Sequence, residues 1–135
     1  MRIMLDTNVL LSALLFPGER MNRMMQSIFE DHRLVLSSFV VDELLYVVKR
    51  KFPGKFQAVD RLLSSMSFEL AYTPQEMEQG LFEIRDRKDY PVLYTAIQDG
   101  VDVLITGDKD FSEVDVEHPE ILTPAQFLER YVNAQ

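Results

Sequence analysis

Four acidic residues of this 135-residue chain stand where they could hold a divalent metal ion: Asp6, Glu43, Asp89 and Asp108. Asp6 and Asp108 follow apolar segments that we expect to be buried strands, and Glu43 lies in the second turn of a helix after a third such segment. Asp89 begins a helix on the side that faces the core. Carboxylates packed together repel one another unless a cation lies between them. Mg²⁺ and Mn²⁺ prefer oxygen ligands, so the acids predict such a centre, suited to phosphodiester hydrolysis.

Short apolar segments with β-branched residues predict the strands that would position these acids. The expected strands cover residues 2–5, 34–37 and 101–106. Helices are expected between them, over 21–30, 39–51 and 89–100, from one-sided apolar spacing and from residues that begin or end helices. This alternation predicts a single α/β domain over residues 1–135, with a short parallel sheet and helices on both faces. Ligands collect at the carboxyl ends of parallel strands, so we expect the acids to meet at that edge.

Two segments carry the signature of a helix start, in which a Thr precedes a Pro and a Glu or Gln follows three residues after the Thr. They are Thr73-Pro74-Gln75-Glu76 and Thr123-Pro124-Ala125-Gln126. The Thr side chain can cap the helix, the Pro suits the first helical position, and the Glu or Gln completes a capping box. Ser38 is expected to cap the helix over 39–51, and Gly100 to end the helix that Asp89 begins.

The composition excludes several classes of protein and of site. The formal charge of −8 argues against a surface that coats nucleic acid, and the four acids account for half of that charge. The chain has no cysteine and two histidines, so it forms no disulfide and would hold a metal mainly through oxygen. Charges interrupt every apolar run, and no secretory leader is recognisable, so we expect a soluble, cytoplasmic protein with no membrane association.

Four segments together resemble the PIN-domain nucleases. They are MLDTNVLLSALLFPG (4–18), VVDELLYVV (40–48), RDRKDYPVLYTAIQDG (85–100) and VLITGDKDF (103–111). The likeness covers nearly the whole chain in the family's order, and is strongest to the prokaryotic members regarded as toxins of toxin-antitoxin pairs. An apolar strand followed by Asp also occurs in phosphatases, but those need a second Asp where this chain has Asn8.

The resemblance implies roles for individual residues. Asp6, Glu43, Asp89 and Asp108 match the four acids with which family members bind Mg²⁺ or Mn²⁺ and cleave single-stranded RNA. Beyond these four, Asp110 matches a fifth acid of many members, and Asn8 and Thr106 match small polar positions that could hydrogen-bond the carboxylates or water. Asp86 could replace or assist Asp89. An antitoxin protein is the partner that the resemblance implies.

Each acid also has a purely structural interpretation. Asp6 and Asp89 are residue types that cap helices, and capping is compatible with binding a metal. Asp108 and Asp110 could belong to an ordinary surface turn. A buried Glu43 requires a partner in either interpretation, because unpaired buried carboxylates are rare.

A second hypothesis is a non-catalytic PIN-like module. Such a module would use its acidic pocket to hold a cation or to engage basic residues of a protein partner. Metal-dependent cleavage of RNA separates the two hypotheses.

Two basic segments, 49–55 and 85–88, could steer phosphates toward the site, with Phe52 or Tyr90 as a stacking surface, or could simply be solvated helix ends. Apolar surface expected on the helices near 21–30 and 56–66 makes a homodimer a further prediction.

Overall fold

The predicted parallel sheet is present, with two additional strands at its edges. The computed structural model describes residues 1–133, the side chain of Ser112 excepted. The strands are all parallel in the order β3-β2-β1-β4-β5. Their bounds are β1 Arg2–Leu5, β2 Arg33–Ser37, β3 Glu69–Ala71, β4 Val103–Ile105 and β5 Glu120–Leu122. The predicted strands correspond to β1, β2 and β4, although β4 is shorter than the segment 101–106. The missed strands have three residues each and lack a continuous apolar run.

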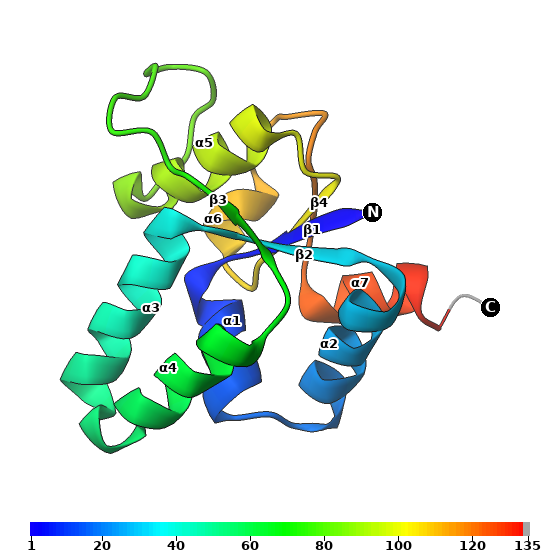
Figure 1. Cartoon of the computed structure of the whole chain (residues 1–135). Helices are drawn as coiled ribbons and strands as arrows, with labels where there is room; N and C mark the ends of the chain where they lie inside the picture. The colour runs from blue at the N-terminus through cyan, green and yellow to red at the C-terminus, as the bar shows by residue number, and fades with distance from the viewer. Residues whose placement is uncertain (134–135) are drawn as a thin grey trace.

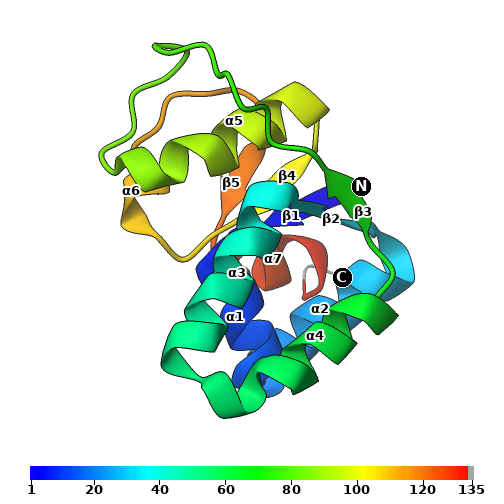
Figure 2. The same cartoon turned by 60° about the vertical axis from the view of Figure 1, so that its left-hand side comes forward.

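Helices cover both faces of the sheet. The α-helices of the described residues are α1 Thr7–Leu15, α2 Glu19–Asp31, α3 Ser38–Lys51, α4 Phe56–Ser65, α5 Tyr90–Asp99, α6 Lys109–Ser112 and α7 Pro124–Tyr131. Two 3₁₀ turns, η1 Pro53–Lys55 and η2 Arg87–Asp89, precede α4 and α5. Helix α5 lies on one face, and α1, α2, α4 and α7 lie on the other (Figures 1 and 2). In residues 1–133, no helix has the length and apolar character needed to cross a membrane.

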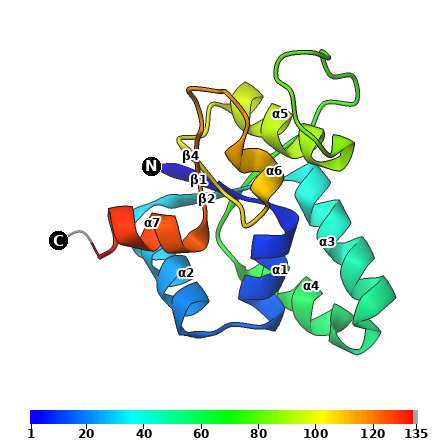
Figure 3. The same cartoon turned by 180° about the vertical axis from the view of Figure 1, so that it is seen from behind.

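The central strand β1 directs Asp6 to the middle of the carboxyl edge. Ile3 is paired with Val103 of β4, and Met4 lies between Val35 of β2 and Leu104 of β4. All five of these side chains are buried, so both faces of the sheet centre are covered. Figure 3 shows the beginnings of α1 and α3 close to the short helix α6, at the end of the sheet to which β1 runs.

The helix predicted to begin at Thr73 is wrong. Residues 72–86 form a loop without helix or strand between β3 and η2. The Thr73 hydroxyl accepts a hydrogen bond from Phe39 N at 3.3 Å and another from Thr95 Oγ1 at 2.9 Å, while Thr73 N donates to Ser38 Oγ at 2.9 Å. The residue therefore binds the beginning of α3 and the middle of α5. Contacts distant in sequence have replaced the local capping interaction.

The other predicted helix ends are close to those observed. Thr123 begins α7 with a complete capping box. Helix α3 begins one residue earlier than expected, because Ser37, and not Ser38, accepts the hydrogen bond from Val40 N at 3.1 Å. Gly100 ends α5 in the left-handed conformation at φ 67°, which glycine adopts without a steric penalty.

Candidate active site

Asp6 links the end of β1 to the beginning of α1. Its Oδ1 accepts a hydrogen bond from Val9 N at 2.9 Å, and its Oδ2 accepts one from the Thr106 hydroxyl. Burial raises the pKa of Asp6, the two hydrogen bonds oppose that rise, and the charges of Asp108 and Glu43 add to it. Asp6 is therefore both the helix cap of the structural interpretation and an acid held among other acids.

Thr106, at the end of β4, organises the acids that follow it. Its hydroxyl oxygen accepts a hydrogen bond from Asp108 N at 3.0 Å while the hydroxyl donates to Asp6. Asp108 Oδ1 in turn accepts from Asp110 N at 2.9 Å and caps α6. These local bonds form a turn, as the structural interpretation expected, and they bring the turn's carboxylates toward the end of β1.

Asp89 carries the least satisfied carboxylate of the described residues. Its Oδ2 is buried and has no hydrogen-bond partner there, and the side chain does not cap α5. The pKa of Asp89 is raised to about 7, first by burial and then by the charges of Asp108 and Asp86, a hydrogen bond with Asp108 and the charge of Asp110. The expectation that Asp89 points inward is thus correct. A buried carboxylate oxygen surrounded by acids fits a divalent cation, which would remove the repulsion.

A close group of acids includes Asp86 and Asp110, which the sequence analysis placed after the four principal candidates. One carboxylate oxygen from each of Asp86, Asp89 and Asp110 lies within 4.8 Å of the others. Asp86 is held by its own turn, where its Oδ1 accepts from Lys88 N at 3.0 Å and its carbonyl accepts from Asp89 N at 3.0 Å. Asp86 and Asp89 are three residues apart in the sequence. This spacing indicates that their carboxylates lie close together only when the turn between them is known.

Glu43 and Asn8 stand at the margin of the site. Glu43 is half-buried in the second turn of α3, and its charge acts on Asp6. Its neighbour Asp42 is exposed. Asn8 is exposed in the first turn of α1, and within residues 1–133 its side chain has no hydrogen bond to the carboxylates. Thr106 therefore carries the supporting hydrogen bonds in the described structure.

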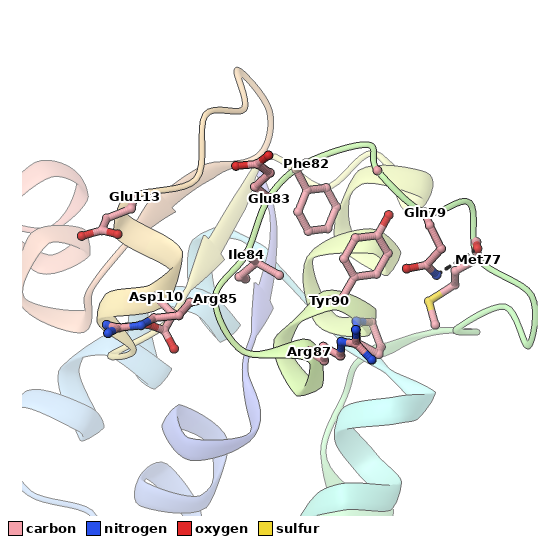
Figure 4. Close-up of a pocket in the computed structure, with 12 residues that line it drawn as sticks. Met77, Gln79, Phe82, Glu83, Ile84, Arg85, Arg87, Tyr90, Asp110 and Glu113 are labelled. Atoms are coloured by element: carbon pink, nitrogen blue, oxygen red, sulfur yellow. Dashed lines mark hydrogen bonds and ion pairs between the residues drawn. The ribbon is translucent and has the colours of Figure 1, made fainter.

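A cavity of about 790 Å³ adjoins the acids on the side of loop 72–86 (Figure 4). Asp110 belongs to both the cavity lining and the acidic group. Arg85 also lines the cavity, and its Nη1 lies 3.9 Å from Asp110 Oδ1. An 83% exposed side chain at this distance makes a weak ion pair. This pair therefore compensates little of the charge of Asp110.

The two basic segments occupy different places. Residues 49–55 comprise the last residues of α3 and the 3₁₀ turn η1 before α4, at the end of α3 remote from the sheet (Figure 1). Residues 85–88 lie beside the acids, and Arg85 and Arg87 line the cavity. Segment 49–55 therefore has the position of a solvated helix end, and segment 85–88 does not.

Comparison with known proteins agrees with this arrangement. A model of the PIN domain matches residues 2–110. A similar fold occurs in the solved structure of VapBC2 from Rickettsia felis bound to a DNA fragment from its promoter. The TM-score is 0.69 and the sequence identity is 23%, and the match covers 90% of this chain and 97% of that chain. No curated protein matches the sequence. Since the PIN-domain match covers most of the chain, from β1 to the acids after β4, this chain belongs to the PIN-domain family.

Proposed function

We propose that this chain is a divalent-metal-dependent endoribonuclease that cleaves single-stranded RNA and acts as the toxin of a toxin-antitoxin pair. The observation that carries the proposal is the buried, unpartnered Oδ2 of Asp89 at the centre of converging acids. PIN-domain membership supports a nuclease. The resemblance of the four motifs to toxins of toxin-antitoxin pairs favours the toxin assignment, and the likeness in fold to VapBC2 agrees with it.

The chain's own acids would hold the ion. Asp6, Glu43, Asp89 and Asp108 are the proposed ligands, directly or through water, and Asp110 and Asp86 complete the negative wall. The ion would be Mg²⁺ or Mn²⁺, because every candidate ligand is a hard oxygen. When bound, such an ion makes water more acidic and neutralises charge on the phosphate that is attacked.

Hydrogen bonds within the site hold the proposed ligands in position. Thr106 holds Asp6 Oδ2 and the Asp108 backbone in one arrangement, so these carboxylates need little reorganisation before substrate binds. Val9 N fixes the second oxygen of Asp6. A site held on strand ends and helix beginnings is rigid, which suits positioning of a phosphodiester.

Cleavage assays with matched variants test this function. Purified protein is incubated with single-stranded RNA in Mn²⁺, in Mg²⁺ and in chelator, and cleavage is expected only with metal. Glu43→Gln is expected to lower the rate, whereas Asp42→Asn, which removes the same charge from the exposed neighbouring position, is expected to keep it. Absence of cleavage under every metal condition would overturn the nuclease proposal and favour the acidic binding module.

The toxin assignment has its own test. Co-expression with the protein encoded beside this chain is expected to yield a stable complex in which cleavage is suppressed. A partner that supplies arginine or lysine to the acidic site would account for the suppression. Uninhibited cleavage in such a complex would contradict the assignment.

The homodimer stays a prediction. Phe29 of α2 is 45% exposed and Leu62 of α4 is 41% exposed, so apolar surface is present on both predicted helices. Light scattering across a range of concentrations measures the mass directly. A monomer at every concentration would reject the dimer.

A further inference from the structure

The cavity beside the acids has the size and the location of a substrate subsite. Its volume of about 790 Å³ falls in the range of roughly 300–1,000 Å³ that is typical of ligand-binding pockets. It shares Asp110 with the acidic group, so a chain lying in the cavity would continue directly into the proposed metal site. Figure 4 shows its wall formed by loop 72–86 on one side and by the beginning of α5 on the other.

Two arginines of the cavity are available to bind phosphate. Arg85 is 83% exposed, and within residues 1–133 its guanidinium makes only the weak contact with Asp110. Arg87 is exposed, and in the part of the chain that the structure describes its guanidinium has no ion pair. Guanidinium groups match the geometry of phosphate oxygens. Two of them next to a site for phosphodiester cleavage favour the backbone of a nucleic acid as the occupant.

The aromatic wall of the cavity is already in place. The rings of Phe82 and Tyr90 stack with their centroids 4.4 Å apart, and the Tyr90 hydroxyl donates to the Glu78 carbonyl. Glu78 N donates to the Tyr94 hydroxyl at 3.2 Å. Loop 72–86 is thus fastened to α5 at its midpoint and near its end. Phe82 is 8% exposed, and Tyr90 also stacks on Tyr94 with their centroids 5.9 Å apart, so these rings stiffen the wall. A preformed wall can receive a nucleic-acid strand with little loop ordering on binding.

We propose that this cavity is the subsite that holds the RNA strand next to the cleaved phosphodiester, with Arg85 and Arg87 as its phosphate-binding residues. The inference rests on the proposed function. Two arginines beside a site for phosphodiester cleavage favour a nucleic-acid backbone over a basic protein segment, although Glu83, Asp110 and Glu113 give the lining more acids than arginines. Glu83 and Glu113 also line the cavity, and their negative charges are expected to lower the affinity for phosphate.

Binding measured without cleavage tests the subsite. Fluorescence polarisation of a short labelled oligouridine is followed in chelator, with the full chain and with Arg85→Gln/Arg87→Gln. The double variant is expected to weaken binding about 5- to 150-fold, and to lower the slope of log Kd against log salt by roughly 0.7 for each phosphate that the protein no longer neutralises. Glu83→Gln/Glu113→Gln is expected to tighten binding.

Lys88→Gln is the matched control. Lys88 is an exposed cation of the same segment that does not line the cavity, so its replacement is expected to change binding less than twofold. With Mn²⁺, the double arginine variant is expected to raise KM while kcat changes little. Thermal denaturation of each variant verifies that the fold is retained.

The outcomes separate the two proposals. Unchanged RNA binding and KM in a folded double arginine variant would overturn the subsite while leaving the nuclease intact. An equal loss in Lys88→Gln would also overturn it, because the effect would then be one of general charge. If the wild-type protein cleaves no RNA under any metal condition, the proposed function is wrong. The polarisation measurement in chelator would still decide whether this cavity binds the RNA strand.

Discussion

The Thr106 hydroxyl donates a hydrogen bond to Asp6 Oδ2, and these residues stand 100 positions apart in the sequence. They meet because β1 and β4 are paired in parallel, with Leu5 beside Ile105, so that the residues leaving the two strands lie together. The same hydroxyl oxygen accepts from Asp108 N at 3.0 Å. One side chain therefore contacts two candidate ligands, Asp6 at its carboxylate and Asp108 at its backbone.

Replacing Thr106 by Val should lower activity without unfolding the protein. The shape of the side chain is kept, but Asp6 loses the donor that opposes the burial-driven rise in its pKa. Loss of a residue that orients metal ligands typically costs about 10- to 100-fold in metal affinity or activity. The measurement is kcat/KM on single-stranded RNA as a function of Mn²⁺. Thr106→Ser retains the hydroxyl and should recover most of the rate, and equal losses in both variants would contradict the role.

Asp6→Asn should abolish cleavage and raise the melting temperature of the metal-free protein. The amide keeps an oxygen that can accept from Val9 N, and it removes a buried charge next to Asp108 and Glu43. Sites that carry function commonly lower stability in this way. Differential scanning calorimetry in chelator gives the comparison.

Asp6→Ala provides the control, because it removes the helix cap together with the charge. Loss of an N-cap costs about 1 kcal/mol, or roughly 4 °C for a chain of this size. The alanine variant should therefore be less stable than the asparagine variant. If the asparagine variant melts well below wild type instead, Asp6 is a structural cap.

The sequence predicted the part of the site that the central strands determine. Asp6 and Asp108 follow apolar segments that pair at the middle of the sheet, so their meeting follows from the strand pattern and the parallel topology. Asp89 follows from the one-sided apolar spacing of α5, which directs its carboxylate inward. The edge strands β3 and β5 have no such pattern, because three residues, most of them only partly buried, carry little periodic signal.

The contribution of loop 72–86 could not be predicted. Thr73 and the residues after it carry every local signal of a helix start, but the Thr73 hydroxyl contacts Phe39 and Thr95, which are remote in sequence. Asp86 ends this loop, and its place beside Asp89 and Asp110 depends on where the loop is fastened. Local sequence patterns cannot predict the position of a residue that long-range hydrogen bonds determine.

Stability of the metal-free protein should fall as the pH rises from about 4 to about 7. The pKa of Asp89 is about 7 in the folded protein and 3.8 when unperturbed, so in this window the folded state binds more protons than the unfolded state. Stability then decreases with rising pH and levels off above the folded pKa. Urea denaturation in chelator across this range measures the slope. Asp89→Asn should flatten it, and equal slopes in variant and wild type would contradict a raised pKa of Asp89.

Mn²⁺ should stabilise the wild-type protein through the same carboxylate that destabilises it without metal. An ion that binds only the folded state adds about 2.7 kcal/mol at one hundred times its Kd, which corresponds to a rise of roughly 10 °C. Asp89→Asn removes the charge of the buried carboxylate that has no partner at Oδ2, so Mn²⁺ should raise the melting temperature of this variant much less. Asp42→Asn removes a charge from an exposed position of α3 and should keep it. If both variants respond to Mn²⁺ as wild type does, the ion binds elsewhere and the converging acids do not form its site.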